Sequence, residues 1–171
     1  MTIMGPLPVT GVALAGFMGV GKSTVGPLVA DRLGLPWWDL DRRVEERSGQ
    51  SISDLFRTRG EAVFRDLELE ALRSGLAEGP AVVSLGGGVT RTRGAVAALK
   101  EAGFRCVVLH ASWATIATRI QGGDRPLAAE AQTRFEERRA HYLQLGTQIP
   151  TDGRAADAVA AAVVDLVMSW C

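Results

Sequence analysis

One stretch of the sequence, residues 16–23, constrains the fold more than any other. Its glycines, lysine and serine have the spacing of a phosphate-binding P-loop, G-x-x-x-x-G-K-S. Glycine tolerates the positive φ and the close backbone approach by which such a loop turns its N–H groups towards phosphate oxygens. Lys22 can reach the oxygens between the β- and γ-phosphates, and the Ser23 hydroxyl is placed to ligate Mg²⁺. The loop residues that we expect to bind the nucleotide are Gly16, Gly19, Val20, Gly21, Lys22, Ser23 and Thr24.

The segments on either side of this loop have the strand–loop–helix context that it needs. Residues 11–15 are an apolar run typical of a buried parallel strand, and an amphipathic segment runs from residue 23 to about residue 34. A helix that begins at Gly21 would direct its N-terminal dipole at the phosphates. Lys22 and Lys100 are the two lysines of a chain that otherwise uses arginine, which indicates a need for that particular cation in the loop. A glycine-rich turn without function is disfavoured because the pattern spans eight positions.

Composition limits the classes of partner. The 171 residues suffice for one domain with a sizeable core, and 19 basic residues balance 19 acidic ones. This balance provides no overall basic field for nucleic acid or membrane, so a small anionic ligand is favoured. Residues 1–10 lack a basic leader and no apolar run is long enough to span a bilayer, so we expect a cytoplasmic protein. Cys106 and Cys171 have neither metal-ligand nor disulfide spacing and are expected to be inert thiols.

Strand-like and helix-like segments alternate along the rest of the chain. Such alternation predicts a parallel sheet with helices on both faces, a three-layer α/β domain. Gly60 is expected to break a helical region, and residues 121–126, which lack apolar periodicity, are expected to form a mobile lid. The predicted strands are residues 11–15, 35–41, 81–85, 104–109 and 148–151. The predicted helices are residues 21–34, 51–56, 61–76, 92–102, 112–120, 135–145 and 155–167, and the polar residues 42–48 are helix-compatible.

A pair of acids and a glycine triplet each follow a predicted strand, and both should lie at the carboxyl edge of the sheet. Asp39 and Asp41 end the second strand and would point to one face if the strand geometry persists. One of these acids suits the Mg²⁺ shell, and the other can accept a hydroxyl proton. A helix cap ahead of Arg42 is the alternative, which the preceding P-loop disfavours. The three glycines at residues 86–88 would allow a ligand close backbone approach.

Arginines supply the remaining candidates. Arg65 lies among apolar residues on a predicted helix, where a salt-bridged structural role is equally open. Arg138 and Arg139 precede Tyr142 and could also form a solvated helix face. Arg125 lies in the lid-like segment, where an arginine has little structural purpose. An arginine that swings onto a transferring phosphoryl group stabilises the charge there.

Together these motifs resemble the shikimate kinase family over nearly the whole chain. In that family the first acid of the D-x-D pair supports Mg²⁺, and the second contacts the shikimate hydroxyls and is the candidate base. The resemblance therefore implies these roles for Asp39 and Asp41. It also implies transfer of the γ-phosphate of ATP to the 3-hydroxyl of shikimate, giving shikimate 3-phosphate and ADP, in aromatic amino acid (chorismate) biosynthesis. The residues that carry the resemblance are 16–23, 39–41, Phe64-Arg65 with Glu68, 86–88, Arg125-Pro126-Leu127, and Glu137-Arg138 with Tyr142.

The resemblance also implies how the two substrates are held. Arg65 and Arg138 would bind the shikimate carboxylate, with Arg138 preferred over Arg139 because it stands four residues before Tyr142. The implied catalytic residues are Lys22, Asp41 and Arg125, and the implied metal ligands are Ser23 and Asp39. The implied substrate-binding residues are Asp41, Arg65, Gly86, Gly87, Gly88 and Arg138, while Arg119 and Arg125 would contact ATP beyond the loop.

The implied architecture is a nucleoside-monophosphate-kinase-like α/β domain with a five-stranded parallel sheet, acting as a monomer. Residues 1–171 would form a single P-loop kinase domain, with a substrate-binding region at about 41–78 and a lid at about 121–132. Ala128 departs from the family, in which a second leucine often follows R-P-L, so the closed lid is expected to pack less tightly. Three alternatives stay open: a kinase of another polyol acid such as gluconate, a non-catalytic ligand-sensing domain of the same fold, and an adenylate-kinase-like enzyme.

Overall fold

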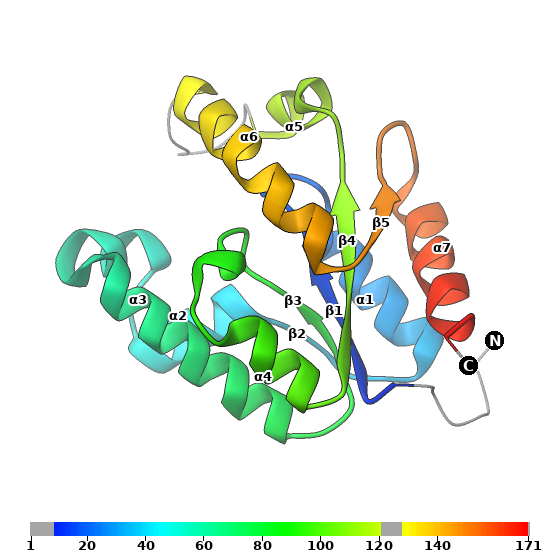
Figure 1. The fold of residues 1–171 in the computed structure, drawn as a ribbon, viewed down its shortest axis with the longest axis horizontal. Coiled ribbons are helices and arrows are strands. Elements are labelled where there is room, and N and C mark those ends of the chain that lie inside the picture. The colour runs from blue at the N-terminus through cyan, green and yellow to red at the C-terminus, as the bar shows by residue number, and fades with distance from the viewer. Residues whose placement is uncertain (1–8, 121–127, 171) are drawn as a thin grey trace.

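The computed structural model describes residues 9–120 and 128–170, in which a parallel sheet carries helices on both faces (Figure 1). This is the three-layer α/β fold that the sequence predicted. Its strands are β1 (Gly11–Ala15), β2 (Trp37–Asp39), β3 (Val82–Ser84), β4 (Phe104–His110) and β5 (Thr147–Pro150). Its helices are α1 (Lys22–Leu33), α2 (Leu40–Ser48), α3 (Ile52–Ala77), α4 (Ala95–Glu101), α5 (Trp113–Ile120), α6 (Ala128–Leu145) and α7 (Ala156–Met168), with a 3₁₀ turn, η1, at Val89–Arg91.

The strand order, β2-β3-β1-β4-β5, creates the ligand crevice. β1 pairs with β3 on one side, from Val12 opposite Val82 to Leu14 opposite Ser84, and with β4 on the other side. The chain therefore runs out to β2, returns to β3 beside β1, and then crosses to the far side of β1. Loops that follow two adjacent strands and turn to opposite faces leave a crevice at the carboxyl edge of the sheet. The P-loop and the glycine triplet are these two loops.

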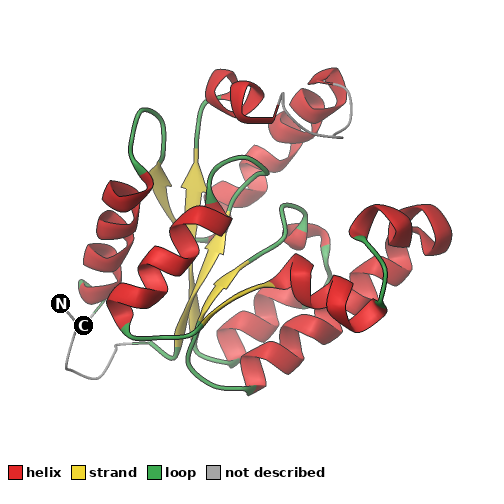
Figure 2. Ribbon diagram, turned by 180° about the vertical axis from the view of Figure 1, so that it is seen from behind, coloured by secondary structure: helices red, strands yellow, loops and turns green. Residues whose placement is uncertain are grey.

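Helices cover both faces of the sheet, which explains the continuous apolar runs in its strands. Helices α1 and α7 pack together on one face, and α4 and α6 lie against β4 on the other, as the opposite views in Figures 1 and 2 show. Strands buried on both faces are apolar throughout rather than alternating. None of the helices in the described ranges combines the length and apolar character that a membrane span requires. The fully buried strand residues include Val12, Ala13, Leu14, Val82, Val83, Val107 and Val108.

The first helix packs unusually closely against the sheet at Gly26. A Cβ atom there would lie 2.3 Å from Trp37 Nε1 and 2.8 Å from Ser84 Oγ, so a larger residue would displace α1. The indole Nε1 donates a hydrogen bond to Ser84 Oγ at 3.0 Å, and Ser84 Oγ donates to the main-chain carbonyl of Lys22 at 3.1 Å. These contacts fix the start of α1, and with it the P-loop, relative to β2 and β3.

The structure corrects one prediction about the two acids after β2. The strand ends at Asp39 and α2 begins at Leu40, so Asp41 lies in the first helical turn and not on a continued strand. Asp39 is the N-cap, and its Oδ1 accepts a hydrogen bond from the main-chain N–H of Arg42 at 3.1 Å. The capping role that the sequence analysis disfavoured is therefore real for Asp39, because the carboxylate satisfies an N–H that has no partner within the helix.

Other element boundaries agree with the sequence to within a few residues, with two differences. Gly94, with φ 87°, precedes α4 as its N-cap, so the helix predicted from residue 92 begins only at Ala95 and follows the separate turn η1. Helix α6 begins at Ala128, which places the last residues of the expected lid in its first turns. As predicted, Gly60 interrupts α3, with a non-helical φ of 82° and ψ of 170°. Residues 121–127, with Arg125, lie outside the described residues.

Candidate active site

The P-loop connects β1 to α1 and holds Lys22 over its own backbone. A Cβ atom at Gly16 would lie 2.3 Å from the carbonyl oxygen of Leu109, and the φ of Gly16 is 143°, so only glycine fits there. Lys22 Nζ donates hydrogen bonds to the carbonyl oxygens of Gly16, at 2.5 Å, and Phe17, at 3.1 Å. Burial lowers the pKa of the ammonium to about 8, although Asp41 and Asp39 oppose this shift. Phosphate oxygens would compete with the carbonyls for these N–H donors.

The predicted metal ligands Ser23 and Asp39 lie together beside the loop. Ser23 Oγ is 3.4 Å from Asp39 Oδ2, while the other carboxylate oxygen of Asp39 caps α2. Asp39 can therefore cap α2 with one carboxylate oxygen and still offer the other oxygen to a metal ion. A hydroxyl and a carboxylate oxygen are the hard donors that Mg²⁺ prefers, with waters and nucleotide phosphates completing its shell. The residues present therefore fit a Mg²⁺ ion that a nucleotide brings with it.

Asp41 faces the glycine triplet. A Cβ atom at Gly86 would lie 2.6 Å from Asp41 Oδ1 and 2.9 Å from Glu68 Oε1, which explains why the residue beside these two acids is glycine. Burial raises the pKa of Asp41 to about 6, helped by the negative charges of Asp39 and Glu68, and Lys22 partly offsets the rise. A carboxylate with a raised pKa is a better proton acceptor than an ordinary aspartate and is still ionised at neutral pH.

Arg65 and Glu68 reach the same loop from α3. Arg65 Nη1 donates to Glu68 Oε2 at 2.9 Å, and the buried Thr92 hydroxyl donates to the same oxygen. Glu68 is only 1% exposed, and within the described residues its Oε1 has no hydrogen-bond partner. A Cβ atom at Gly88 would lie 2.6 Å from Arg65 Nη2. Residue 88 is therefore glycine because the Arg65 guanidinium occupies the space that a side chain at this position would need.

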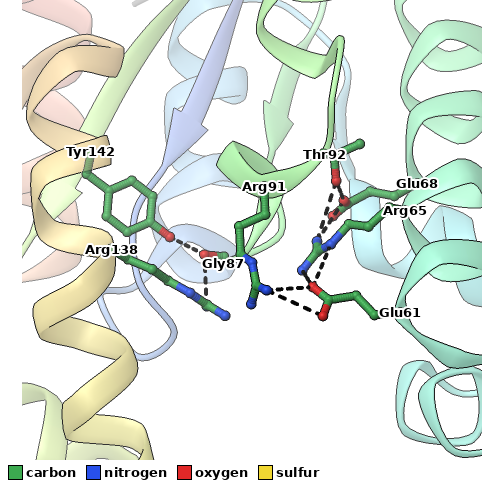
Figure 3. A network of polar contacts seen from close by, with 8 residues as sticks. All are labelled: Glu61, Arg65, Glu68, Gly87, Arg91, Thr92, Arg138 and Tyr142. Atoms are coloured by element: carbon green, nitrogen blue, oxygen red, sulfur yellow. Dashed lines mark hydrogen bonds and ion pairs between the residues drawn. The ribbon is translucent and has the colours of Figure 1, made fainter.

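Arg138 and Tyr142 approach the triplet from the opposite side, on α6. Arg138 Nη1 donates to the Gly87 carbonyl at 3.1 Å, and the Tyr142 hydroxyl donates to the same oxygen (Figure 3). Burial lowers the pKa of Arg138 and raises that of Tyr142 to about 12, so the phenol is neutral at neutral pH. The four-residue spacing puts both side chains on one helix face. Arg139 instead lines a separate cavity of about 520 Å³ with Trp113.

A cavity of about 550 Å³ extends from the P-loop to the start of α7. Arg119 borders it and donates to the Gly19 carbonyl at 3.0 Å and to Thr151 Oγ1 at 3.3 Å, beyond the phosphate end of the loop. The volume of this cavity and its position at the P-loop suit a nucleotide whose phosphates lie at that loop. The residues that border it are Met18, Gly19, Val20, Gly21, Lys22, Ser23, Thr24, Val25, Asp39, Asp41, Leu85, Gly87, Arg119, Thr151, Arg154, Ala156 and Val159.

Sequence reasoning missed several residues that the structure brings to the site. Thr92 contacts Glu68, Arg91 contacts the α3 residue Glu61, and Thr151 and Arg154 border the nucleotide-sized cavity. The sequence could have indicated these residues by position, because they follow the glycine triplet or β5, and loops at the carboxyl edge of a parallel sheet commonly contact ligands. Burial raises the pKa of the Cys106 thiol to about 11, in agreement with the expected inert thiol.

Comparisons with known proteins identify the family. The family model described as shikimate kinase matches residues 18–167. The chain belongs to the shikimate kinase family. A shikimate kinase from Thermus thermophilus is 40% identical over 168 residues, covering 94% of this chain and 91% of that protein. The solved structure of shikimate kinase from Acinetobacter baumannii in complex with shikimate has a TM-score of 0.86 and 27% identity, covering 94% of each chain.

Membership of this family makes the protein an ATP-dependent kinase, a transferase. The fold is the P-loop kinase fold that the sequence predicted, and the recognition of the family from its motifs is confirmed. A gluconokinase from Sinorhizobium meliloti is more distant, with 21% identity and a TM-score of 0.61, covering 96% of this chain and 93% of that one. That likeness shows a shared fold and carries no argument for gluconate as the acceptor.

Proposed function

We propose that the protein transfers the γ-phosphate of ATP to the 3-hydroxyl of shikimate. The observation that carries the proposal is the convergence of Arg65 and Arg138 on one glycine loop that also borders Asp41. Two guanidinium groups suit a carboxylate, and a basic carboxylate suits the attacking hydroxyl. The A. baumannii relative is described as a complex with shikimate, which supports the same acceptor here.

The unpaired Oε1 of Glu68 also supports a polyol acceptor. Buried carboxylate oxygens are normally hydrogen-bonded, but this oxygen has no partner among the described residues, and it lies beside Gly86. A second hydroxyl of the acceptor can donate to it. An acceptor with a carboxylate at one end and several hydroxyls at the other would thus satisfy Arg65, Arg138, Glu68 and Asp41 at once.

In the proposed reaction the acceptor oxygen forms a bond to the γ-phosphorus, the bond from that phosphorus to the β–γ bridging oxygen breaks, and ADP leaves. Asp41 accepts the hydroxyl proton. Lys22 and the N-terminus of α1 neutralise charge on the phosphates, and we propose that Arg125 does so from the lid. Most of the rate acceleration comes from this positioning and charge neutralisation.

We propose Mg²⁺ as the metal that accompanies ATP, held by Ser23 and Asp39. When bound, this ion would neutralise negative charge on the nucleotide phosphates. We further propose one P-loop kinase domain that acts as a monomer in the cytoplasm, where ATP is available. Its acceptor region is residues 41–78 and its lid is residues 121–132.

A coupled ADP-release assay tests the proposal with shikimate, gluconate and nucleoside monophosphates as acceptors. Shikimate is expected to give turnover far above the other acceptors. Lys22→Ala should abolish this turnover while preserving the fold, because the residue serves a ligand charge and not the core. Lys100→Ala, on the exposed face of α4, is the matched control and should retain full activity. Turnover with gluconate and none with shikimate would refute the proposed acceptor.

A further inference from the structure

Glu61 connects two arginines from different parts of the chain. On α3, Arg65 Nε and Nη2 lie 3.3 Å and 3.2 Å from Glu61 Oε1. From η1, Arg91 Nη2 lies 3.3 Å from Oε1 and 3.4 Å from Oε2 of the same carboxylate. Gly60 makes this possible, because its non-helical backbone begins a new helical segment with Glu61 in the first turn. One acid thus holds the two guanidinium groups side by side.

The guanidinium of Arg91 lies between the two arginines of the proposed carboxylate site. Figure 3 shows it between Arg138, which donates to the Gly87 carbonyl, on one side and Arg65 with Glu61 on the other. The pKa of Arg138 is lowered by burial first, and then by the positive charges of Arg91 and Arg65, which reflects their proximity.

The charges of this cluster explain why a third arginine is needed. Arg65 faces two acids, Glu61 and Glu68, so this trio carries a net negative charge. Arg138 only brings the group to neutrality, and Asp41 adds a further negative charge nearby. Arg65 is 14% exposed, so its neighbours' charges are weakly screened. With Arg91 the three guanidinium charges balance the three carboxylates, whereas without it the cluster would be net negative and would repel a carboxylate.

We propose that Arg91 is a third arginine of the acceptor site, which selects for the substrate carboxylate together with Arg65 and Arg138. This inference rests on the proposed function. Glu61 holds Arg91 in place through Nη2, and a guanidinium has further N–H donors with which to bind a ligand. The Arg91 side chain is 54% exposed and that of Arg65 is 14% exposed, so the charge of Arg91 is the more accessible of the two to an acceptor from solvent. The residue therefore contributes to specificity, while Asp41 and Lys22 serve the transfer.

A purely structural salt bridge is the competing explanation. Exposed ion pairs contribute about 0–1 kcal/mol to stability, so loss of a structural pair would lower the melting temperature slightly and affect all ligands alike. Loss of a carboxylate-binding residue would weaken only an acceptor that carries the carboxylate. Arg93, two residues later and exposed on the same connection, provides a control with the same change of charge.

The test measures Kd for shikimate and for its methyl ester by calorimetry, with KM and kcat, in the wild type, Arg91→Gln and Arg93→Gln. Arg91→Gln is expected to raise Kd and KM for shikimate about tenfold and to leave the KM for ATP and kcat within about twofold. Its Kd for the uncharged ester should equal that of the wild type. Arg93→Gln should change none of these values, and thermal unfolding checks that both variants are folded.

Each other outcome overturns the inference. Equal losses of shikimate affinity in Arg91→Gln and Arg93→Gln would indicate a general effect of positive surface charge. Equal losses of affinity for shikimate and for its ester in Arg91→Gln would indicate structural damage. An unchanged shikimate Kd in Arg91→Gln would remove the residue from the site. If the wild type phosphorylates shikimate in any of these cases, the proposed function stands and the role of Arg91 alone falls. If the wild type neither binds nor phosphorylates shikimate, the proposed function fails, and this inference fails with it.

Discussion

The hydroxyl of Ser84 donates a hydrogen bond of 3.1 Å to the main-chain carbonyl of Lys22. Ser84 ends β3, directly before the loop that carries the glycine triplet, and Lys22 begins α1. A single buried hydroxyl therefore links the acceptor side of the crevice to the phosphate side. It also accepts the Trp37 indole N–H at 3.0 Å, so three elements meet at one oxygen atom.

Ser84→Ala is expected to reduce the free energy of unfolding by about 2 kcal/mol, because it removes a buried hydroxyl and leaves the Trp37 indole N–H without its acceptor. Urea denaturation measures this loss. Ser53→Ala, at an exposed position on α3, is the control and should change stability by less than about 0.5 kcal/mol. Equal stability of the two variants would show that water replaces the lost hydroxyl.

Arg138→Lys is expected to raise the KM for shikimate at least about tenfold and to leave the KM for ATP nearly unchanged. An ammonium cannot bind a carboxylate as a fork while it also contacts the Gly87 carbonyl. Arg65→Lys should behave in the same way. Arg139→Lys is the matched control, because this neighbour is exposed and borders the other cavity. An equal effect of Arg138→Lys and Arg139→Lys would contradict the choice between the two arginines.

The two aspartates should respond differently to metal. Asp39→Asn is expected to raise the Mg²⁺ requirement, and added Mg²⁺ should restore part of the rate, because Asp39 lies beside Ser23. Asp41→Asn keeps the size of the side chain but removes the proton acceptor, so it should lower kcat without rescue by Mg²⁺. Titration of both variants with Mg²⁺ at saturating ATP and shikimate decides this. Rescue of Asp41→Asn alone would reverse the two roles.

Asp152 should make stability depend on pH. Hydrogen bonds from the Thr115 and Ser112 hydroxyls and from the Ser112 N–H lower the pKa of this carboxyl from 3.8 to about 2. Because the pKa is depressed in the folded state, the stabilisation is present above about pH 4 and is lost as the pH falls towards 2.

Asp152→Asn is therefore expected to lower the melting temperature at pH 7 by a few degrees, with a gap to the wild type that narrows between pH 4 and pH 2. The gap stays modest because the residue is exposed to solvent. Thermal unfolding at pH 7, 5, 4 and 3 provides the measurement. A gap that is constant over this range would attribute the effect to hydrogen-bond geometry and not to the charge of the carboxylate.

Local patterns in the sequence were sufficient for the fold and for much of the proposed site. The P-loop spacing predicted a phosphate cradle, and the structure has its glycines at positive φ and Lys22 over the loop carbonyls. Apolar runs predicted buried parallel strands because both sheet faces are covered. The break at Gly60 was predicted because glycine is the residue that adopts its backbone conformation without strain. These features depend on residues near one another in the chain.

Other features depended on residues far apart in the chain. The sequence could not show whether Asp41 continued a strand or began a helix, because an aspartate at position 39 is compatible both with a continuing strand and with the N-cap of a helix. It could not place Arg91 beside Glu61, thirty positions away, or the Tyr142 hydroxyl on the Gly87 carbonyl. Such contacts arise from the strand order, which brings the loops after β1 and β3 together, and from the position of α6, which lies across these loops (Figure 1). The sequence by itself determined the elements and the family, whereas tertiary packing decided which charges share a site, because charge and burial act through distance in space.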